Sequence, residues 1–452
     1  MKSRTLQINR PHSKAQQSLL SKFRHKWRTL RFDDVRESTV VYLQNPTKVW
    51  QFGCFLIVLD ILVNVIVINF RKYTEIDWVA YMQHVELFLN GTKDYSKLQG
   101  QTGPIVYPAG HLYTYTALYW ISSAGTNIRI AQYCFVALYT INLIFVFRIY
   151  QKFHLMPPWV LLLICFSSYR IHSIFVLRLF NDPIAMTLLH ASIALVLSDL
   201  WFLGIVAYGL ALSIKMNILL YLPAVGATYV IRHGPLKAAA YLFVPLLMHA
   251  ILPLPFLLSH PWQYLSAAFE FNRQFLFKWT VNWRFLGSEE LFGDRRFHTA
   301  LLTAHVVVVT VFGFAFWFRS RGGLYQLLFD ELKVSYRKFL VDARASLPQV
   351  EIVFAFATSN FIGMMFCRTL HYQFYVWYYY SIPVLLWCTV YNTKYRILLW
   401  GAVELCWNTY PSTDFSSVLL HIVHMAIFLG LCARFRHLKM PDRQTIAAAK
   451  MA

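Results

Sequence analysis

Two carboxylates, Glu75 and Asp77, follow directly after an apolar run, in the stretch KYTEIDWVAYMQHVELFLNG. An E-x-D pair can supply a general base, a hydrogen-bond partner that orients a base, or metal ligands. The alternative is that both residues only cap a helix, because Thr74 followed three residues later by Asp77 fits a capping box. The pattern alone leaves these interpretations open.

The residues after this pair predict a helix that lies on a membrane surface. Apolar side chains recur there with helical spacing, at Ile76, Val79, Ala80, Met82, Val85, Leu87 and Phe88. The start of such a helix would hold Asp77 at the interface, facing a lipid headgroup. Further along, Tyr107 lies in GPIVYPAG, whose Gly and Pro residues predict a specifically shaped turn.

Polar residues interrupt the apolar sequence at two further points. RLFNDP places Arg178, Asn181 and Asp182 between two apolar runs, and SIKMN places Lys215 between two others. Ionisable residues in such positions usually pair with one another or mark a functional site. The alternatives are helix capping before Pro183 for the first group and snorkelling to the interface for Lys215.

Two aromatic stretches hold the remaining candidates. From VNWRFLG and CRTLHYQFYVWYYYS these are Asn282, Trp283, Arg284, Arg368, His371, Tyr372 and Gln373. A belt of aromatic side chains at the membrane interface explains the Tyr and Trp residues without any function. It does not explain the cations among them, and the geometry of Arg suits a phosphate.

Membrane helices must position these residues. The 452-residue chain is 57% hydrophobic, 17% aromatic and only 14% charged, a composition too apolar for a soluble domain of this length. We predict an all-α polytopic membrane protein with about twelve transmembrane or re-entrant helices. The candidate spans are 50–70, 130–147, 158–175, 184–198, 201–213, 218–231, 239–258, 299–318, 352–366, 374–390, 397–408 and 415–433.

The distribution of Lys and Arg predicts the orientation. Basic residues gather before the first apolar run, in the 319–349 loop and after residue 433, so these parts are expected in the cytoplasm. The chain then divides into a basic arm (1–49), a membrane domain (50–433) and a cytoplasmic tail (434–452). The large loops 71–127 and 259–298 would face the opposite side, together with the candidate residues. Much of the net charge of +21 follows from this topology.

The sequence lacks the motifs of several common classes of enzyme and nucleotide-binding protein. The sequence has no phosphate-binding G-x-x-x-x-G-K-[ST] loop, no dinucleotide fingerprint, no H-E-x-x-H and no G-x-S-x-G motif. Its seven cysteines form no C-x-x-C pair, which argues against a zinc site. Nucleotide-driven transport and metalloprotease activity are therefore not expected, and nothing indicates a nucleic acid as partner.

Taken in order, YTEIDWVAYMQ, RLFNDP, SIKMN, VNWRFLG and LHYQFYVWYYYSIPVLLW resemble a known family. They are similar to the endoplasmic-reticulum dolichyl-phosphate-mannose-dependent alpha-1,3-mannosyltransferases of the N-glycan precursor pathway. The resemblance covers about residues 40–435. It implies a GT-C glycosyltransferase architecture in the endoplasmic-reticulum membrane, with the active site in the lumen. The implied donor is dolichyl phosphate mannose, and the implied acceptor is the five-mannose dolichyl-pyrophosphate oligosaccharide.

The resemblance also implies roles for the candidates. Inverting transfer needs a base, which carries over to Asp77, with Glu75 as helper or weaker rival. The expected phosphate-binding residues are Arg284, Arg368, Lys215, His371 and Arg178. The expected substrate-binding residues are Asp182, Asn181, Trp78, Tyr107, Asn282, Trp283, Tyr372 and Gln373. We expect no metal and no cofactor, because Arg and Lys can neutralise the leaving phosphate.

Two other functions are the main alternatives. One is another dolichyl-phosphate-mannose-dependent mannosyltransferase, such as that of the glycolipid-anchor pathway, which composition cannot separate from the first. The other is a transporter or scramblase, which would usually place its charges near the middle of the bilayer, and only Lys215 approaches that position.

Overall fold

The computed structural model describes residues 32–270, 276–325, 327–328 and 347–437. Most of the predicted basic arm, part of the 319–349 loop and most of the tail therefore lie outside the described residues. The described chain is almost entirely helical, which confirms the predicted all-α class. Its strands are β1 (Gln99–Gly100) and β2 (Gly103–Pro104), an antiparallel pair with Gln99 opposite Pro104.

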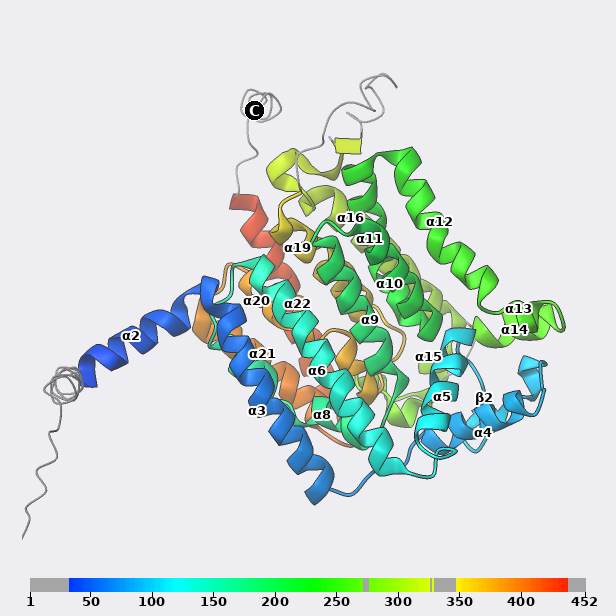
Figure 1. The fold of residues 1–452 in the computed structure, drawn as a ribbon. Helices are drawn as coiled ribbons and strands as arrows, with labels where there is room; N and C mark the ends of the chain where they lie inside the picture. Colours follow the sequence, from blue (N-terminus) through cyan, green and yellow to red (C-terminus); the bar gives the residue numbers. More distant parts are fainter. Residues whose placement is uncertain (1–31, 271–275, 326, 329–346, 438–452) are drawn as a thin grey trace, which may run out of the picture.

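The helices follow one another along the chain as Figure 1 shows. The first half comprises α2 (Phe32–Gln44), α3 (Val49–Phe70), α4 (Trp78–Leu89), α5 (Ala109–Ile121), α6 (Ile128–Phe153), α7 (Val160–Phe166), α8 (Tyr169–His172), α9 (Asn181–Val196), α10 (Trp201–Ile214) and α11 (Leu222–His233). The second half comprises α12 (Pro235–Ile251), α13 (Leu254–Leu257), α14 (Pro261–Ala268), α15 (Glu289–Gly293), α16 (Arg295–Phe316), α19 (Gln349–Met365), α20 (Ile382–Trp387), α21 (Thr393–Asn408) and α22 (Asp414–His437).

Short 3-10 helices and one π-helical turn, η3, connect several of the described helices. They are η1 (Pro46–Lys48), η2 (Tyr95–Lys97), η3 (Ser173–Leu177), η4 (Met216–Tyr221), η5 (Phe277–Trp279), η6 (Arg284–Leu286), η7 (Arg319–Arg321), η8 (Tyr372–Trp377) and η9 (Tyr379–Ser381). The predicted span 374–390 is made of η8, η9 and the short α20. Seven of the fifteen candidate site residues lie in or directly beside such segments, namely Arg178, Lys215, Trp283, Arg284, His371, Tyr372 and Gln373.

Four helical segments of the described chain are long and apolar enough to cross a bilayer. They are Pro46–Phe70, Ile128–Phe153, Arg295–Phe316 and Asp414–Arg434. A bent pair, α7 with Tyr169–Leu177, makes a fifth if it counts as one span, and α10, α12 and α19 are shorter apolar helices. The chain is thus a polytopic membrane protein, while the count of about twelve spans stays a prediction.

The centre of the bundle is built around α9. It packs between α6 and α10, while α3 lies against α6 and α12 against α10 (Figure 1). Helix α9 is buried along nearly its whole length although it is only 16 residues long. Since lipid does not reach most of this helix, its first turn can hold polar side chains that a lipid-facing helix would not tolerate.

A buried polar cluster ties α3 to α6 and α8. Asp60, in the middle of α3, accepts a hydrogen bond from the Tyr139 hydroxyl at 3.0 Å and pairs with His172 Nε2 at 2.7 Å. The other ring nitrogen of His172 faces the Ser168 carbonyl oxygen at 3.1 Å. Both ring nitrogens of His172 therefore meet acceptors, and this cluster holds α8 against the bundle.

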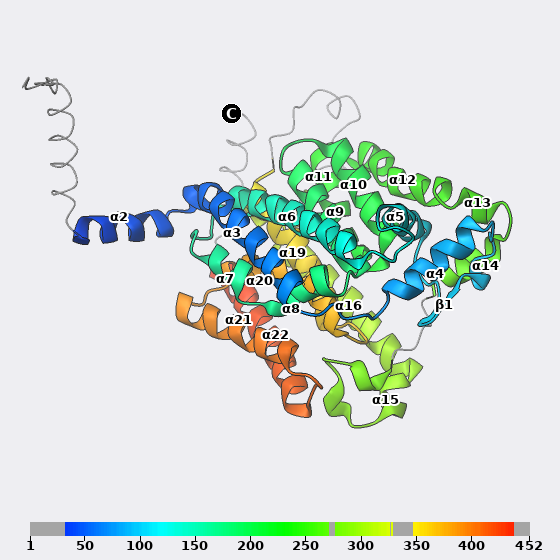
Figure 2. The same cartoon turned by 60° about the horizontal axis from the view of Figure 1, so that its bottom comes forward.

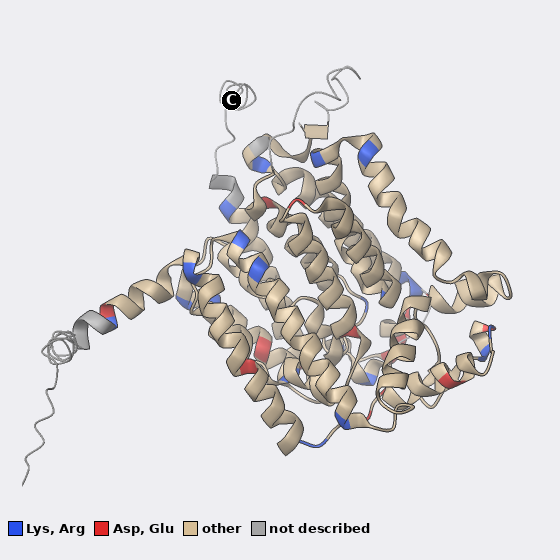
Figure 3. Cartoon of the chain, viewed as in Figure 1, with Lys and Arg blue, Asp and Glu red and all other residues tan. Residues whose placement is uncertain are grey.

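The two ends of the bundle differ. Helices α4, α5 and α13 to α15 lie at one end, and the chain leaves toward its C-terminus at the other (Figures 1 and 2). Many Lys and Arg residues gather at the C-terminal end (Figure 3). Helix α2 projects away from the bundle in both ribbon views (Figure 2).

Helix α4 packs against the protein with one face and is exposed on the other. Of the predicted apolar residues, Ala80, Met82 and Val85 are buried together with Trp78 and Tyr81, whereas Ile76 and Val79 are exposed. The buried face therefore combines aliphatic and aromatic residues, and α4 packs against α5. That this helix lies on a membrane surface stays a prediction.

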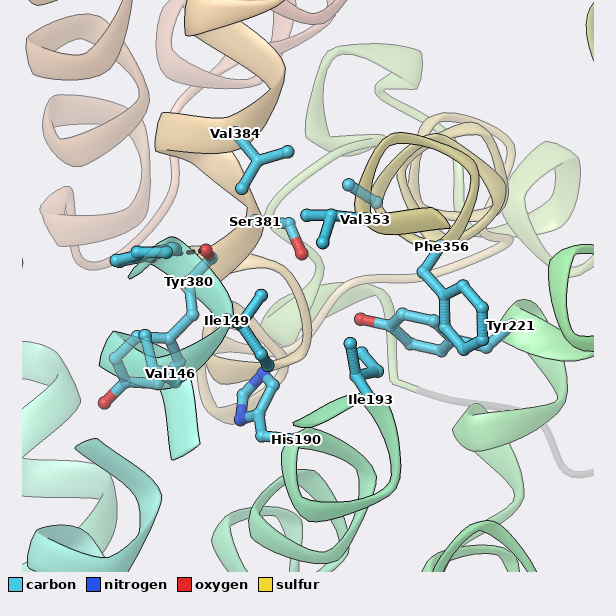
Figure 4. Close-up of a pocket in the computed structure, with 12 residues that line it drawn as sticks. Val146, Ile149, His190, Ile193, Tyr221, Val353, Phe356, Tyr380, Ser381 and Val384 are labelled. Carbon is cyan, nitrogen blue, oxygen red and sulfur yellow. Dashed lines mark hydrogen bonds between the residues drawn. The ribbon is translucent and has the colours of Figure 1, made fainter. Parts of the chain in front are cut away.

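A small cavity lies inside the bundle between α6, α9, α19 and α20 (Figure 4). Its volume of about 30 Å³ suits one water molecule. The hydroxyl groups of Ser381 and Tyr221 point toward it, and the rest of its lining is mainly apolar (Figure 4). None of the predicted site residues lines this cavity.

Candidate active site

Glu75 and Asp77 have different roles at the start of α4. Glu75 Oε1 accepts a hydrogen bond from the backbone N–H of Val79 at 3.0 Å, and its other carboxylate oxygen accepts from the Tyr73 hydroxyl. Asp77 occupies the N-cap position but makes no capping hydrogen bond with its side chain. The predicted capping box is not formed, because Glu75 serves the free N–H of the helix and leaves the carboxylate of Asp77 available.

The carboxylate of Asp77 faces the protein interior. Its Oδ2 accepts a hydrogen bond from the Tyr81 hydroxyl at 3.3 Å. Burial raises the pKa of Asp77 above its ordinary value, although the nearby ammonium of Lys215 and the Tyr81 hydrogen bond both lower it. A carboxylate with a raised pKa is a stronger base than one in water, so the environment suits proton abstraction.

Lys215 connects this carboxylate to α9. It stands in extended backbone at the break between α10 and η4, with φ −155° and ψ 135°. Its ammonium pairs with Asp182 Oδ2 at 2.7 Å and donates to Asn181 Oδ1 at 2.9 Å. Asn181 and Asp182 make no side-chain cap on α9, so neither helix capping nor snorkelling describes these residues.

The side chains of Asn181 and Asp182 make further hydrogen bonds, to residues of α5 and η8. The Trp377 indole N–H donates to Asp182 Oδ1, and Asn181 Nδ2 donates to His111 Nδ1 at 3.2 Å. Burial, with smaller contributions from His84 and Lys215, lowers the pKa of His111 well below its ordinary value. His111 is therefore a neutral acceptor that fixes the orientation of Asn181.

Close packing between α5 and α10 makes this convergence possible. A Cβ atom on Gly110 would lie 2.2 Å from Ser213 Oγ and 2.8 Å from the Ser213 carbonyl oxygen. Only a residue without a side chain lets the start of α5 approach the end of α10 so closely. This contact places His111 beside the segment that carries Lys215.

A cleft of about 220 Å³ opens beside Lys215. Predicted residues Tyr107, Lys215 and Arg368 line it. Its full lining is Val106, Tyr107, Lys215, Met216, Asn217, Ala268, Phe269, Glu270, Cys367, Arg368, Thr369, Phe374 and Trp377. The Lys215 ammonium lies 5.3 Å from the ring centroid of Tyr107 and 5.4 Å from that of Phe374. Two cations among aromatic rings suit an anion attached to an apolar or sugar group.

Asn282 and Trp283 brace the wall of this cleft. Asn282 Nδ2 and the Trp283 indole N–H both donate to the Cys367 carbonyl oxygen, at 2.7 and 2.8 Å. Asn282 Oδ1 accepts from the backbone N–H of Leu370 at 2.9 Å. Because the Asn282 side chain is occupied by these bonds, the observed geometry gives it a positioning role beside Arg368.

The other predicted residues lie outside the cleft lining. Trp78 is buried in the core, where its indole N–H donates to the Gly125 carbonyl oxygen at 3.0 Å. The Arg284 guanidinium lies 4.7 Å from the ring centroid of Phe277. His371 stacks on Phe374, with 5.4 Å between the ring centroids, and Gln373 is partly buried next to it.

Arg178 and Tyr372 belong to a different group. Arg178 follows η3, where its guanidinium donates to the Ser173 hydroxyl. The Tyr372 hydroxyl donates to the Thr409 carbonyl oxygen at 2.9 Å. The guanidinium of Arg170 lies over the Tyr372 ring, 4.6 Å from the ring centroid. These residues lie around α8 and the end of α21.

The sequence did not single out His111, Phe374, Trp377 or Arg170. The aromatic run around Trp377 was explained as an interfacial belt. Among the described residues, no group of three or more His, Cys, Asp or Glu side chains is placed to hold a metal ion. The expectation of a metal-independent reaction stays a prediction.

Comparison with known proteins gives the family of the chain. Residues 54–417 match the family described as ALG3 protein. The chain is similar to two proteins named Dol-P-Man:Man(5)GlcNAc(2)-PP-Dol alpha-1,3-mannosyltransferase. It is 46% identical to that of Mus musculus over 392 residues, which cover 86% of this chain and 88% of the relative. It is 42% identical to that of Arabidopsis thaliana over 385 residues, with 84% and 87% covered. No solved structure matches. With most of its length matched in this way, the chain belongs to the ALG3 protein family.

Proposed function

We propose that this protein transfers mannose from dolichyl phosphate mannose to the dolichyl-diphosphate-linked Man5GlcNAc2 oligosaccharide, forming an alpha-1,3 bond. The names of its relatives state the donor, the acceptor and the linkage. We further propose a GT-C architecture, residence in the endoplasmic reticulum, cytoplasmic termini and an active site on the lumenal side. The gathering of Lys and Arg at the bundle end opposite α4 and α5 supports this orientation (Figure 3).

The proposed mechanism rests on the different contacts that Glu75 and Asp77 make at the start of α4. Glu75 accepts a hydrogen bond from a free N–H group of α4, and Asp77 keeps a carboxylate of raised pKa within electrostatic reach of Lys215. In the reaction, Asp77 takes the proton of the acceptor hydroxyl while that oxygen bonds to the anomeric carbon of mannose. The bond from this carbon to the phosphate oxygen breaks, and its electron pair leaves with the phosphate.

The cations of the cleft stabilise the leaving group. Arg368 can hold a phosphate with two parallel N–H groups, and Lys215 adds a point charge. Asp182 pairs with Lys215 in the resting enzyme and so holds its ammonium in place. Tyr107 and Phe374 surround this ammonium with rings that exclude water.

The purified protein tests this function. Labelled mannose is offered on dolichyl phosphate with two acceptors, the Man5GlcNAc2 lipid and a glucosaminyl phosphatidylinositol of the glycolipid-anchor pathway. We expect transfer to the first acceptor only, and a product from which an alpha-1,3-specific mannosidase releases the label. Transfer to the glycolipid alone would contradict the proposed acceptor.

A further inference from the structure

A second basic cluster lies around α8 and η3, outside the lining of the cleft. It consists of Arg170 on α8, Arg178 after η3, and the surrounding rings of Tyr169, Tyr372 and Tyr410. Phe374 and Trp377 of η8 line the cleft, whereas Tyr372 of the same element covers Arg170. The segment η8 thus separates two cationic sites.

We propose that Arg170 and Arg178 bind the diphosphate of the lipid-linked acceptor, at a site separate from the cleft that holds the donor phosphate. This inference rests on the proposed function, since it assigns one substrate to each site. It gives Arg170 a role that the sequence did not indicate, and it gives Arg178 a specific ligand.

The geometry of Arg170 is that of a prepared anion-binding group. Its side chain is largely buried, with 6% of the residue exposed. The Arg170 Nε–H donates to Asn408 Oδ1 at 3.3 Å, and the guanidinium lies 4.6 Å from the ring centroid of Tyr372. These contacts fix the plane of the guanidinium, so a phosphate would bind it with little loss of side-chain freedom.

Among the described residues, the carboxylate whose charge acts on this pair is that of Glu404, and it forms no salt bridge with either arginine. Neither Arg170 nor Arg178 takes part in a salt bridge within the described part of the chain. The nearby carboxylate of Glu404 accepts from the Tyr375 hydroxyl at 2.6 Å and from Asn408 Nδ2 at 2.8 Å, and so orients the amide that holds Arg170. Burial, and next the charge of Arg170, lower the pKa of Arg178. An anion between the two guanidinium groups would relieve this repulsion.

The rim of the cluster is exposed, and its inner side is firmly supported. Tyr169 and Tyr410 on the rim are 65% and 61% exposed, so a lipid headgroup would approach the buried Arg170 along this rim. The Tyr410 ring packs against that of Tyr372, with 5.3 Å between the centroids. On the inner side, the pairing of His172 with Asp60 holds α8 in place.

The chemistry decides which lipid belongs to which site. The donor phosphate is bonded to the carbon that is attacked, so it must lie next to Asp77 and therefore in the cleft near Lys215. In the acceptor, by contrast, sugars separate the reacting mannose hydroxyl from the diphosphate. A diphosphate also carries more charge than a monophosphate, which suits two arginines.

The test measures Michaelis constants for both lipids separately, with the other lipid saturating. We expect Arg178→Gln to raise the acceptor KM about tenfold or more, the loss that follows from removing a charged hydrogen-bond donor. The donor KM should change less than about twofold. Arg170→Lys keeps the positive charge but loses the paired N–H donors of the planar guanidinium group. It should raise the acceptor KM less than Arg178→Gln does. Arg296→Gln, at an exposed residue in the second predicted outer loop, is the matched control and should change neither constant.

Dolichyl diphosphate without sugars probes the phosphate contact alone. It should compete with the acceptor in the wild type and inhibit Arg178→Gln about tenfold more weakly, while inhibition by dolichyl phosphate stays the same. Thermal midpoints in detergent confirm that each variant is folded. An unchanged acceptor KM in both variants, or a raised donor KM in its place, would overturn the site assignment. A wild type that transfers no mannose to this acceptor would instead refute the proposed function.

Discussion

The buried pair of Lys215 and Asp182 gives a quantitative prediction. Their side chains are 10% and 0% exposed, so water screens the interaction very little. Removing one partner leaves the other charge buried without compensation, which typically costs roughly 3–5 kcal/mol. We therefore expect both Asp182→Asn and Lys215→Met to lower the free energy of unfolding by about 3 kcal/mol or more.

The double variant separates a charge effect from a packing effect. Asp182→Asn with Lys215→Met leaves neither charge, so its loss of stability should be no larger than that of either single variant. Unfolding in mixed micelles, followed by tryptophan fluorescence, measures all four proteins. The double variant should still be inactive, because the cleft has lost its ammonium. Small single effects of less than about 1 kcal/mol that simply add would refute the inference that the pair is buried and coupled.

Three further predictions concern the base and its supports. Because burial raises the pKa of Asp77, kcat/KM should fall on acidification with an apparent pKa above the ordinary aspartate value of about 3.9, and a pH profile with no such limb would contradict this. Gly110→Ala should destabilise the protein and impair turnover, since its Cβ would clash with Ser213; a thermal midpoint equal to wild type would speak against this contact. Asn282→Ala should cost about 1–3 kcal/mol and raise the donor KM, because the Cys367 carbonyl loses a donor beside the cleft; unchanged stability and KM would exclude the bracing role.

The sequence predicted the class of the fold because membrane helices depend on local composition. The runs at 50–70, 130–147 and 299–318 correspond closely to α3, α6 and α16. Interrupted runs were harder to interpret, since 374–390 is as apolar as a span but folds into η8, η9 and α20. Whether such a run crosses the bilayer depends on what it packs against, and periodicity does not contain that information.

The site shows the same limit at the level of single residues. Glu75 and Asp77 are indistinguishable as candidates in the sequence, because their roles depend on where α4 begins. The pairing of Lys215 with Asp182 joins residues 33 positions apart and is set by the packing of α9 against α10. The predicted apolar face of α4 was only partly right for a related reason, since the sequence does not show which face α5 covers: Ala80, Met82 and Val85 are buried, whereas Val79 is exposed.

Comparison of Asp77→Asn with Glu75→Gln tests the central claim most directly. Both variants replace one carboxylate in the same segment by its amide, and transfer of labelled mannose to the Man5GlcNAc2 lipid is measured in detergent with a chelator present. The proposed mechanism predicts that Asp77→Asn stays folded but loses activity by a factor of about 100 or more, because a base is missing. Glu75→Gln should keep most of its kcat and lose mainly stability. Substantial activity of Asp77→Asn, or a larger loss in Glu75→Gln, would contradict the assignment of Asp77 as the base.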